Sequence, residues 1–340
     1  MNKQVHHIVC ATDDNYADYC SVMLFSLFEN NNKSSFIVHI LVEQLNEYYK
    51  KRIISSLKKF NQQIVFHEVD ETKLEAVKFR KENPLTKAAY FRILLASVLH
   101  ENIKKVLYLD CDILVLKPID VLFDLNLTEY ALAAVKDQEK MPKNEEHRFQ
   151  LNMSYRQNYF NSGVMLINLE YWRKECAESK LLEFAQKTRT VYFHDQDALN
   201  YLFADKWFEL PPQWNRFNQV VYDKNNFVTK DDKLRYLYDP AIIHYASNIK
   251  PWLNIKFVKY KKIYKQYYQK CFAVDLKEKK GKNTLNMYRI LLEIDLLNFA
   301  YGTPLIVKIP LISFFNFVRI LCAIVIGKKV SCISLYDYKV

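Results

Sequence analysis

Val106-Leu107-Tyr108-Leu109-Asp110-Cys111-Asp112 joins a short apolar run to two carboxylates. The apolar run predicts a short strand buried in a sheet. Two carboxylates next to a core are costly unless a positive charge neutralises them. Carboxylate oxygens suit a hard divalent cation such as Mn²⁺ or Mg²⁺. We therefore expect a metal site where this strand ends; the alternative for two such aspartates is a solvated turn.

The segments on both sides of this strand alternate between strand and helix patterns. Strand patterns lie at 7–11, 36–42, 64–69 and 105–109, and helical patterns at 16–28, 46–61 and 87–99. Such alternation predicts an α/β fold whose mostly parallel central sheet is covered by helices on both faces. Ligands of these sheets bind beyond the carboxyl ends of the strands. We therefore expect function to depend on the residues that follow the strands.

Two polar residues, Asp13 and Asn15, follow the first strand and precede an apolar helical pattern. Aspartate and asparagine in this position commonly cap the helix. The functional alternative is that both side chains hydrogen-bond a base or ribose held against the sheet edge. Both interpretations remain open from the residues alone.

Three later segments also place polar side chains beside apolar runs. Asn161 lies two residues before Gly163, where a tight turn and a close backbone approach to a ligand are both open. Asp195 and Gln196 open a helical pattern with more polar groups than capping explains. His244 ends a strand pattern. A lone histidine is more often structural, but imidazole is an acceptable ligand for Mn²⁺ beside two carboxylates.

Glycine is scarce in this chain. The 340 residues include 4 glycines, where average usage of about 7% would give roughly 24. No two lie close together, so neither a dinucleotide-binding fingerprint nor a P-loop is present. Any nucleotide must therefore be bound without a glycine-rich phosphate loop.

The net charge of +11 is confined to the C-terminal part of the chain. Residues 1–252 carry 33 basic and 33 acidic side chains, whereas residues 253–340 carry 16 basic and 5 acidic ones. A nucleic-acid binder is expected to be basic on its folded body, so we expect no nucleic-acid partner. A neutral body with a basic tail indicates an interaction segment instead. We divide the chain into a body at 1–252 and a basic, helical, apolar extension at 253–340.

This extension is also rich in apolar and aromatic residues. Tyrosines and lysines alternate at helical spacing over 260–270, and an apolar run at 309–326 is broken by Pro310 and Arg319. A central arginine costs about 2.5–3.5 kcal/mol in a spanning helix. A helix lying in an anionic membrane surface therefore fits better than a spanning one. The alternative is an ordinary helix packed on the body.

Cysteine usage bears on the cellular compartment. Seven cysteines without a CxxC pair predict reduced, mostly buried thiols rather than a disulfide framework or a zinc site. The N-terminal residues lack the apolar segment of a secretion signal. Both features favour a cytoplasmic protein.

Six motifs, in this order, resemble those of family 8 of the retaining glycosyltransferases, most closely the bacterial lipopolysaccharide and lipooligosaccharide α-glycosyltransferases. The motifs fall within residues 6–252 and read AxDxNY at 11–16, YxR at 90–92, LYLDxD at 107–112, FNSGV at 160–164, DQDxLN at 195–200 and HYxxxxKPW at 244–252. The resemblance implies a GT-A fold. It also implies a UDP-glucose or UDP-galactose donor used with Mn²⁺ (or Mg²⁺).

The resemblance assigns binding roles to residues of these motifs. Three would ligate the metal ion: Asp110, Asp112 and His244. Six would contact the nucleotide part of the donor: Ala11, Asp13, Asn15, Cys111, Ser247 and Lys250. Ser247 stands where many relatives carry glycine, and a serine narrows the backbone conformations available there. Donor affinity is what this difference is expected to affect.

Four residues are expected to serve catalysis: Arg92, Asn161, Asp195 and Gln196. Arg92 would support the donor site, the other three would line the donor sugar, and Asp137 is expected near donor or acceptor. Retention follows either from double displacement, with Asp195 as the nearest carboxylate, or from same-face attack within an ion pair. Gln196 is too weak a nucleophile to favour double displacement, so same-face attack is expected.

The resemblance therefore predicts a retaining hexosyltransferase that acts on a lipid-linked or surface glycan, the lipopolysaccharide or lipooligosaccharide core. Its expected location is the inner face of the bacterial cytoplasmic membrane, bound to the anionic surface through residues 253–340. One alternative is a relative that glycosylates a protein or another surface polysaccharide. The other is a catalytically degenerate, membrane-associated scaffold.

Overall fold

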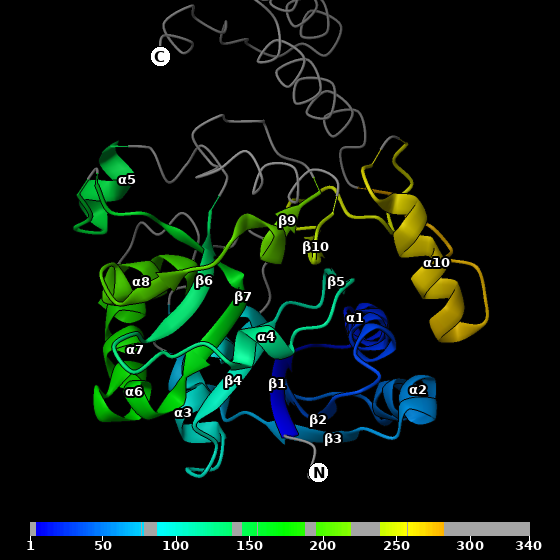
Figure 1. The fold of residues 1–340 in the computed structure, drawn as a ribbon, viewed down its shortest axis with the longest axis horizontal. Helices are drawn as coiled ribbons and strands as arrows, with labels where there is room; N and C mark the ends of the chain where they lie inside the picture. Colours follow the sequence, from blue (N-terminus) through cyan, green and yellow to red (C-terminus); the bar gives the residue numbers. More distant parts are fainter. Residues whose placement is uncertain are drawn as a thin grey trace, which may run out of the picture.

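A seven-stranded sheet forms the centre of the molecule (Figure 1). The computed structural model describes residues 5–75, 77, 87–137, 145–154, 156–187, 195–218, 239–256 and 258–281. The strand order is β3-β2-β1-β4-β7-β6-β8. The strands are β1 (Val5–Ala11), β2 (Ser35–Val42), β3 (Gln63–Glu68), β4 (Lys105–Leu109), β6 (Leu132–Lys136), β7 (Phe160–Asn168) and β8 (Trp207–Glu209).

Strand direction within this sheet decides which residues meet at the site. β3, β2, β1 and β4 run parallel, and β6 runs parallel to β8. β7 runs antiparallel to both of its neighbours, β4 and β6. The expected mostly parallel sheet is confirmed, with one reversed strand. Because of that reversal, the amino end of β7 lies at the edge where β1 and β4 end.

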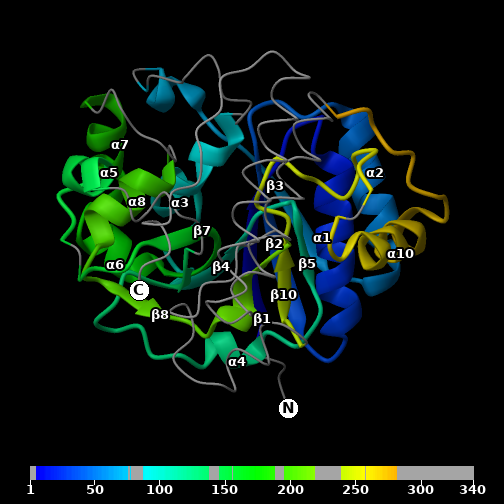
Figure 2. The same ribbon diagram turned by 90° about the horizontal axis from the view of Figure 1, so that it is seen from above.

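Helices cover both faces of the sheet, as the α/β prediction requires (Figure 2). One face is covered by α1 (Ala17–Asn30), α2 (Glu47–Leu57) and α10 (Lys261–Phe272), and the 3₁₀ helix η1 (Lys58–Phe60) follows α2. The other face is covered by η3 (Lys87–Leu94), α3 (Leu95–Val98), α6 (Leu169–Lys174), α7 (Ala177–Lys187) and α8 (Asp195–Phe203). Each face has its own buried apolar cluster, so the molecule has three layers.

A second, three-stranded sheet lies over the carboxyl end of β4. Its order is β5-β10-β9, made of β5 (Ile113–Val115), β10 (Ile242–His244) and β9 (Arg216–Phe217). β10 pairs antiparallel with β5, and the Tyr245 amide donates to the Asp112 carbonyl at 2.9 Å. This pairing brings the end of β10 to the loop that follows β4. The remaining short helices are η2 (Glu71–Leu74), α4 (Asp120–Phe123), α5 (Glu145–Gln150) and η5 (Pro212–Asn215).

The segment at 87–99 differs from its expected helix. Most of it is the 3₁₀ helix η3, and only Leu95–Val98 is α-helical. Within η3, the Arg92 side chain folds back and its Nε donates to the Ala89 carbonyl at 2.8 Å. An α-helix would use that carbonyl for the amide of Ile93. The tighter winding accompanies the turn of Arg92 toward the sheet edge.

The described part of the basic extension packs against the body. Helix α10 buries Tyr264, Tyr267 and Tyr268, and the Tyr267 hydroxyl accepts a hydrogen bond from Asn30 of α1 at 2.7 Å. Residues 282–340, which include the apolar run at 309–326, lie outside the described residues. No helix in the described ranges has the length and apolar character needed to cross a bilayer. The division of the chain at residue 252 stays a prediction.

Candidate active site

Two carboxylates and one imidazole meet at the carboxyl end of β4. Asp110 and Asp112 follow β4, and His244 ends β10. His244 Nε2 lies 3.2 Å from Asp112 Oδ1 and 3.8 Å from Asp110 Oδ2. One ligand atom from each residue lies within 4.8 Å of the other two. We call these three residues the carboxylate–imidazole cluster; they are the set that the sequence assigned to a metal.

Asn215 of η5 fixes the orientation of His244. His244 Nδ1 lies 2.9 Å from Asn215 Oδ1, and Asn215 Nδ2 donates to Asn161 Oδ1 at 2.8 Å. Since the amide nitrogen donates to Asn161, its oxygen accepts from Nδ1–H of His244, which turns Nε2 toward the two aspartates. Histidine ligands of metals are held in this way by a partner on the other ring nitrogen. Asn215 belongs to none of the motifs, and its role was not predicted.

Gly163 explains how these side chains come so close to β7. A Cβ at this position would lie 2.3 Å from His244 Cε1 and 2.7 Å from Asp110 Oδ2. No ordinary side chain fits at those distances, so the bare backbone of β7 is required. Gly163 thus lies within β7 rather than in a tight turn, and its close backbone approach is to the side chains of the cluster. An approach of this backbone to a ligand stays a prediction.

Two cations flank the cluster. Lys250 Nζ lies 2.5 Å from Asp112 Oδ2, and Arg92 donates to Asp110 Oδ1 at 2.9 Å. Burial alone would raise the pKa of Asp112, but the charges of Lys250 and His244 outweigh it and hold that pKa well below its ordinary value. The cluster thus offers carboxylate oxygens and a directed imidazole nitrogen. This donor set fits Mn²⁺ or Mg²⁺.

Arg92 connects the cluster to helix α8. Its guanidinium donates to the Ser162 carbonyl at 2.7 Å, and its Nε lies 2.9 Å from Asp195 Oδ2. Arg92 and Asp195 are both buried. Burial raises the pKa of Asp195 to about 6, and the opposing charge of Arg92 keeps it from rising further. The structure therefore brings together two residues that the motifs separate by more than 100 positions.

Gln196 is the centre of a buried amide network. Its Oε1 accepts from Asn161 Nδ2 and from the Ser162 amide, both at 2.9 Å, and its Nε2 donates to Asp137 Oδ2 at 3.1 Å. Asn161 Nδ2 also donates to Asp137 Oδ2 at 3.2 Å. Asp137, which the sequence placed loosely, thus contacts both of the amides expected at the donor sugar.

The residues after β1 lie along the same edge. Asp13 Oδ1 accepts from the amides of Asn15 and Tyr16, both at 2.9 Å, and so closes the turn ahead of α1. The N-cap residue of α1 is Tyr16, and no side chain caps this helix. Asn15 is exposed. The Cys111 thiol donates to the Ala11 carbonyl at 3.1 Å, which joins this segment to the loop after β4. Contacts of these residues with uridine remain a prediction.

Ser247 lies between His244 and Lys250 with an ordinary backbone. Its φ angle is not positive, unlike that of five other non-glycine residues in the described ranges. Its hydroxyl accepts from the Ile249 amide at 3.2 Å. Serine is therefore accommodated here without the left-handed conformation that favours glycine.

Comparison with known families gives one match along most of the chain. Residues 7–256 match the family model described as Glycosyl transferase family 8. The matched range includes every residue of the cluster, Arg92, Gln196 and Lys250.

Similar proteins include enzymes of bacterial surface glycans. General stress protein A of Bacillus subtilis is 34% identical over 73% of this chain and 88% of its own length. A lipopolysaccharide 1,2-glucosyltransferase of Escherichia coli is 27% identical over 74% of each chain. The crystal structure of the galactosyltransferase LgtC with donor and acceptor sugar analogs superposes with a TM-score of 0.68 at 25% identity, over 77% of this chain and 95% of that one.

Proposed function

This chain belongs to glycosyltransferase family 8, and we propose that it moves glucose or galactose from a UDP-sugar to a surface glycan with retention of anomeric configuration. Membership of the family makes the protein a glycosyltransferase, and its fold is the GT-A fold of LgtC. The sugar, the metal and the acceptor are the proposed parts. The acceptor we favour is a lipopolysaccharide or lipooligosaccharide core, since similar proteins include a lipopolysaccharide glucosyltransferase.

The observation that carries this proposal is the carboxylate–imidazole cluster at the edge of the sheet. Buried carboxylates are retained only with counter-charges or a ligand that needs them. Here Gly163, which has no side chain, leaves room for the His244 ring, and the side-chain amide of Asn215 orients that ring. The fixed position and orientation of His244 beside the two aspartates support a metal site rather than a solvated turn.

The chemistry centres on the departing UDP. Asp110, Asp112 and His244 would hold a Mn²⁺ or Mg²⁺ ion, which would supply positive charge to the diphosphate of the leaving UDP. Lys250, whose Nζ also donates to the Tyr245 carbonyl at 2.6 Å, adds a positioned ammonium beside it. The amide network of Gln196 and Asn161 would orient the hydroxyls of the donor sugar.

The contacts of the residues near the donor sugar favour same-face attack. Asp195 faces Arg92, so its charge is already neutralised by a buried guanidinium. Gln196 Oε1 accepts two hydrogen bonds at 2.9 Å, which leaves it a poor nucleophile. We propose that a donor β-phosphate oxygen takes the acceptor proton as the acceptor oxygen attacks the face that UDP leaves. A trapped glycosyl adduct on Asp195 would contradict this route.

A panel of UDP-sugars, scored for UDP release with Mn²⁺, with Mg²⁺ and after chelation, tests the proposed activity. We expect release from UDP-glucose or UDP-galactose that depends on the divalent ion and rises when a core oligosaccharide is added. No release from any UDP-sugar would favour the scaffold alternative. Stimulation by a protein or another polysaccharide instead would change the acceptor but not the reaction.

The extension is proposed to hold the enzyme at an anionic membrane surface. In the described part, three of the lysines of α10 are paired: Lys261 and Lys265 with Glu278 of the extension itself, and Lys270 with Glu29 of the body. The proposed contact therefore falls to the residues after Gly281. We expect full-length protein to sediment with anionic vesicles and a chain ending at residue 283 not to do so; equal sedimentation would contradict it.

A further inference from the structure

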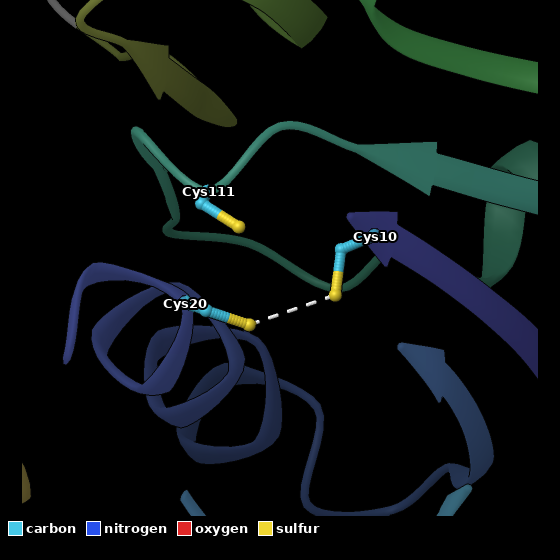
Figure 3. Close-up of side chains that lie close together, drawn as sticks. All are labelled: Cys10, Cys20 and Cys111. Carbon is cyan, nitrogen blue, oxygen red and sulfur yellow. Dashed lines mark hydrogen bonds between the residues drawn. The ribbon is translucent and has the colours of Figure 1, made fainter. Parts of the chain in front are cut away.

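Three thiols converge beneath the loop that carries the two aspartates (Figure 3). Cys10 lies near the end of β1, Cys20 on α1, and Cys111 between Asp110 and Asp112. Cys10 and Cys20 are fully buried, and Cys111 is 6% exposed. We call these three residues the thiol cluster. Within the described ranges, this group and the carboxylate–imidazole cluster are the two that bring three potential ligands to within 4.8 Å.

The spacing of the three sulfurs suits one cation in their midst. Cys10 Sγ lies 3.6 Å from Cys20 Sγ, and all three Sγ atoms lie within 4.8 Å of one another. A trigonal site with metal–sulfur bonds of about 2.3 Å needs sulfurs separated by about 4.0 Å. The Cys10–Cys20 separation is about 0.4 Å below that value, and the other two are at most about 0.8 Å above it, so small side-chain adjustments would complete such a site.

The ligand type selects the class of cation. Sulfur alone is a soft ligand set that favours Cu⁺, Zn²⁺ and similar d¹⁰ ions over Mn²⁺ and Mg²⁺. Cys111, at 6% exposure, is the least buried of the three and lies on the loop that it shares with the proposed metal ligands. From this geometry we infer that Cys10, Cys20 and Cys111 form a binding site for one soft, thiophilic cation, separate from the carboxylate–imidazole cluster.

A cation bound to the thiol cluster should affect the sheet edge that carries the carboxylate–imidazole cluster. This consequence rests on the proposed function. The Cys111 thiol donates to the Ala11 carbonyl at 3.1 Å, and Ala11 is expected to face the donor base. A thiolate that ligates a cation cannot make this donation. A bound soft cation is therefore expected to displace the loop of Asp110 and Asp112 and to slow transfer.

Cadmium is a suitable probe because its bonds to thiolate give an ultraviolet charge-transfer band, which carboxylate and imidazole ligands do not. The full-length protein is titrated with Cd²⁺ in reducing buffer with excess Mn²⁺ to occupy the carboxylate–imidazole cluster. We expect a band that reaches its maximum at one Cd²⁺ per chain. In Cys20→Ala, the Cd²⁺ affinity read from this band should be about 100-fold lower. Even the loss of a group that only orients a ligand costs 10- to 100-fold in metal affinity.

Cys176→Ala is the matched control, since Cys176 is free and exposed. It should leave the band unchanged. A band that survives Cys20→Ala, or no band in the wild-type protein, would overturn the proposal. If Cys20→Ala does not fold, X-ray absorption of the cadmium-loaded wild-type protein decides. Three sulfur neighbours support the site, and oxygen or nitrogen neighbours refute it.

Turnover is measured in the same samples. We expect Cd²⁺ to inhibit the wild-type protein and to spare Cys20→Ala. The failure of the thiol site and that of the proposed function are distinguishable, because the charge-transfer band reads binding without any substrate. A band without UDP release would contradict the transferase proposal alone.

Discussion

Two three-residue clusters share the loop after β4 and differ in every property that selects a ligand. Asp110 and Asp112 belong to one, and Cys111, which lies between them, belongs to the other. The first offers oxygen and nitrogen and is flanked by Arg92 and Lys250. The second offers sulfur and lies among apolar side chains. Alternate residues of one loop thus serve a charged site and an apolar one.

The difference shows how neighbours, more than burial, set the ionisation of a group. Lys250 and His244 overcome burial and keep the pKa of Asp112 low. The hydrogen bond with Cys10, together with burial, raises the pKa of Cys20 well above its usual value. The Asp112 carboxylate is therefore ionised and ready for a hard cation. The thiol cluster stays neutral until a cation strong enough to displace protons arrives.

Asp112→Asn tests the charged side of this comparison with the largest expected effect. It removes one charge from the carboxylate–imidazole cluster and leaves Lys250 without its carboxylate partner. We expect metal-dependent UDP release to fall by about 10³-fold, the upper range for loss of one electrostatic contact in a transition state. The thiolate–cadmium band should remain. Retained turnover would refute the metal assignment.

Gly163→Ala attacks the same cluster by steric means. The added Cβ would lie 2.3 Å from the His244 ring, which must then move. We expect about a 10²-fold loss of turnover, because displacement of a catalytic contact by about 1 Å costs that much. Thermal unfolding and the cadmium band serve as controls for the fold. An unimpaired variant would show that His244 need not lie against β7.

Asn215→Leu tests whether metal binding requires the orientation of the His244 imidazole as well as its presence. It removes the acceptor of the His244 Nδ1 proton, so both ring tautomers become accessible. We expect Mn²⁺ affinity to fall 10- to 100-fold, measured by Mn²⁺ binding and by the Mn²⁺ dependence of turnover. Asn215→Asp, which keeps the acceptor, should restore most of it. Equal losses in both variants would indicate a structural role instead.

Cys20→Ala has the smallest expected effect on catalysis. It truncates a fully buried side chain of α1 that lies outside the proposed donor site. We expect a stability loss of about 1–2 kcal/mol from the cavity it leaves, measured by denaturant unfolding. Turnover without added soft cations should stay within about twofold of wild type. A larger loss of turnover would mean that the thiol cluster supports the loop even when empty.

Local patterns predicted most of the body. The strands β1 to β4, helices α1 and α2, and the two aspartates of the carboxylate–imidazole cluster follow from short apolar runs and the polar residues beside them. His244 was assigned to the cluster only by the family resemblance. The reversal of β7 was not predicted, because alternation with helices says nothing about direction in the second half of the sheet. Its amino end nevertheless meets the edge where the site was expected.

The features that the sequence did not predict depend on long-range pairing. The absence of a CxxC pair argued against a thiol site, yet Cys111 is 91 residues from Cys20 along the chain and reaches it through β1 and β4 pairing. Asn215 lies in a short 3₁₀ helix without a motif and reaches His244 because β9 and β10 pair. No local signal identifies partners that meet only through the sheets.

The stack of Trp252 on Tyr19 limits where this chain can be shortened. The two ring centroids lie 3.6 Å apart. Trp252 follows Lys250 by two residues, and Tyr264 of α10 packs on the same tryptophan. The Lys279 amide donates to the Trp252 carbonyl at 2.8 Å, and the Asn254 amide donates to the Lys279 carbonyl at 2.8 Å. The family match ends at residue 256, before Tyr264 and Lys279, which make these contacts. A minimal active fragment should therefore run to Gly281.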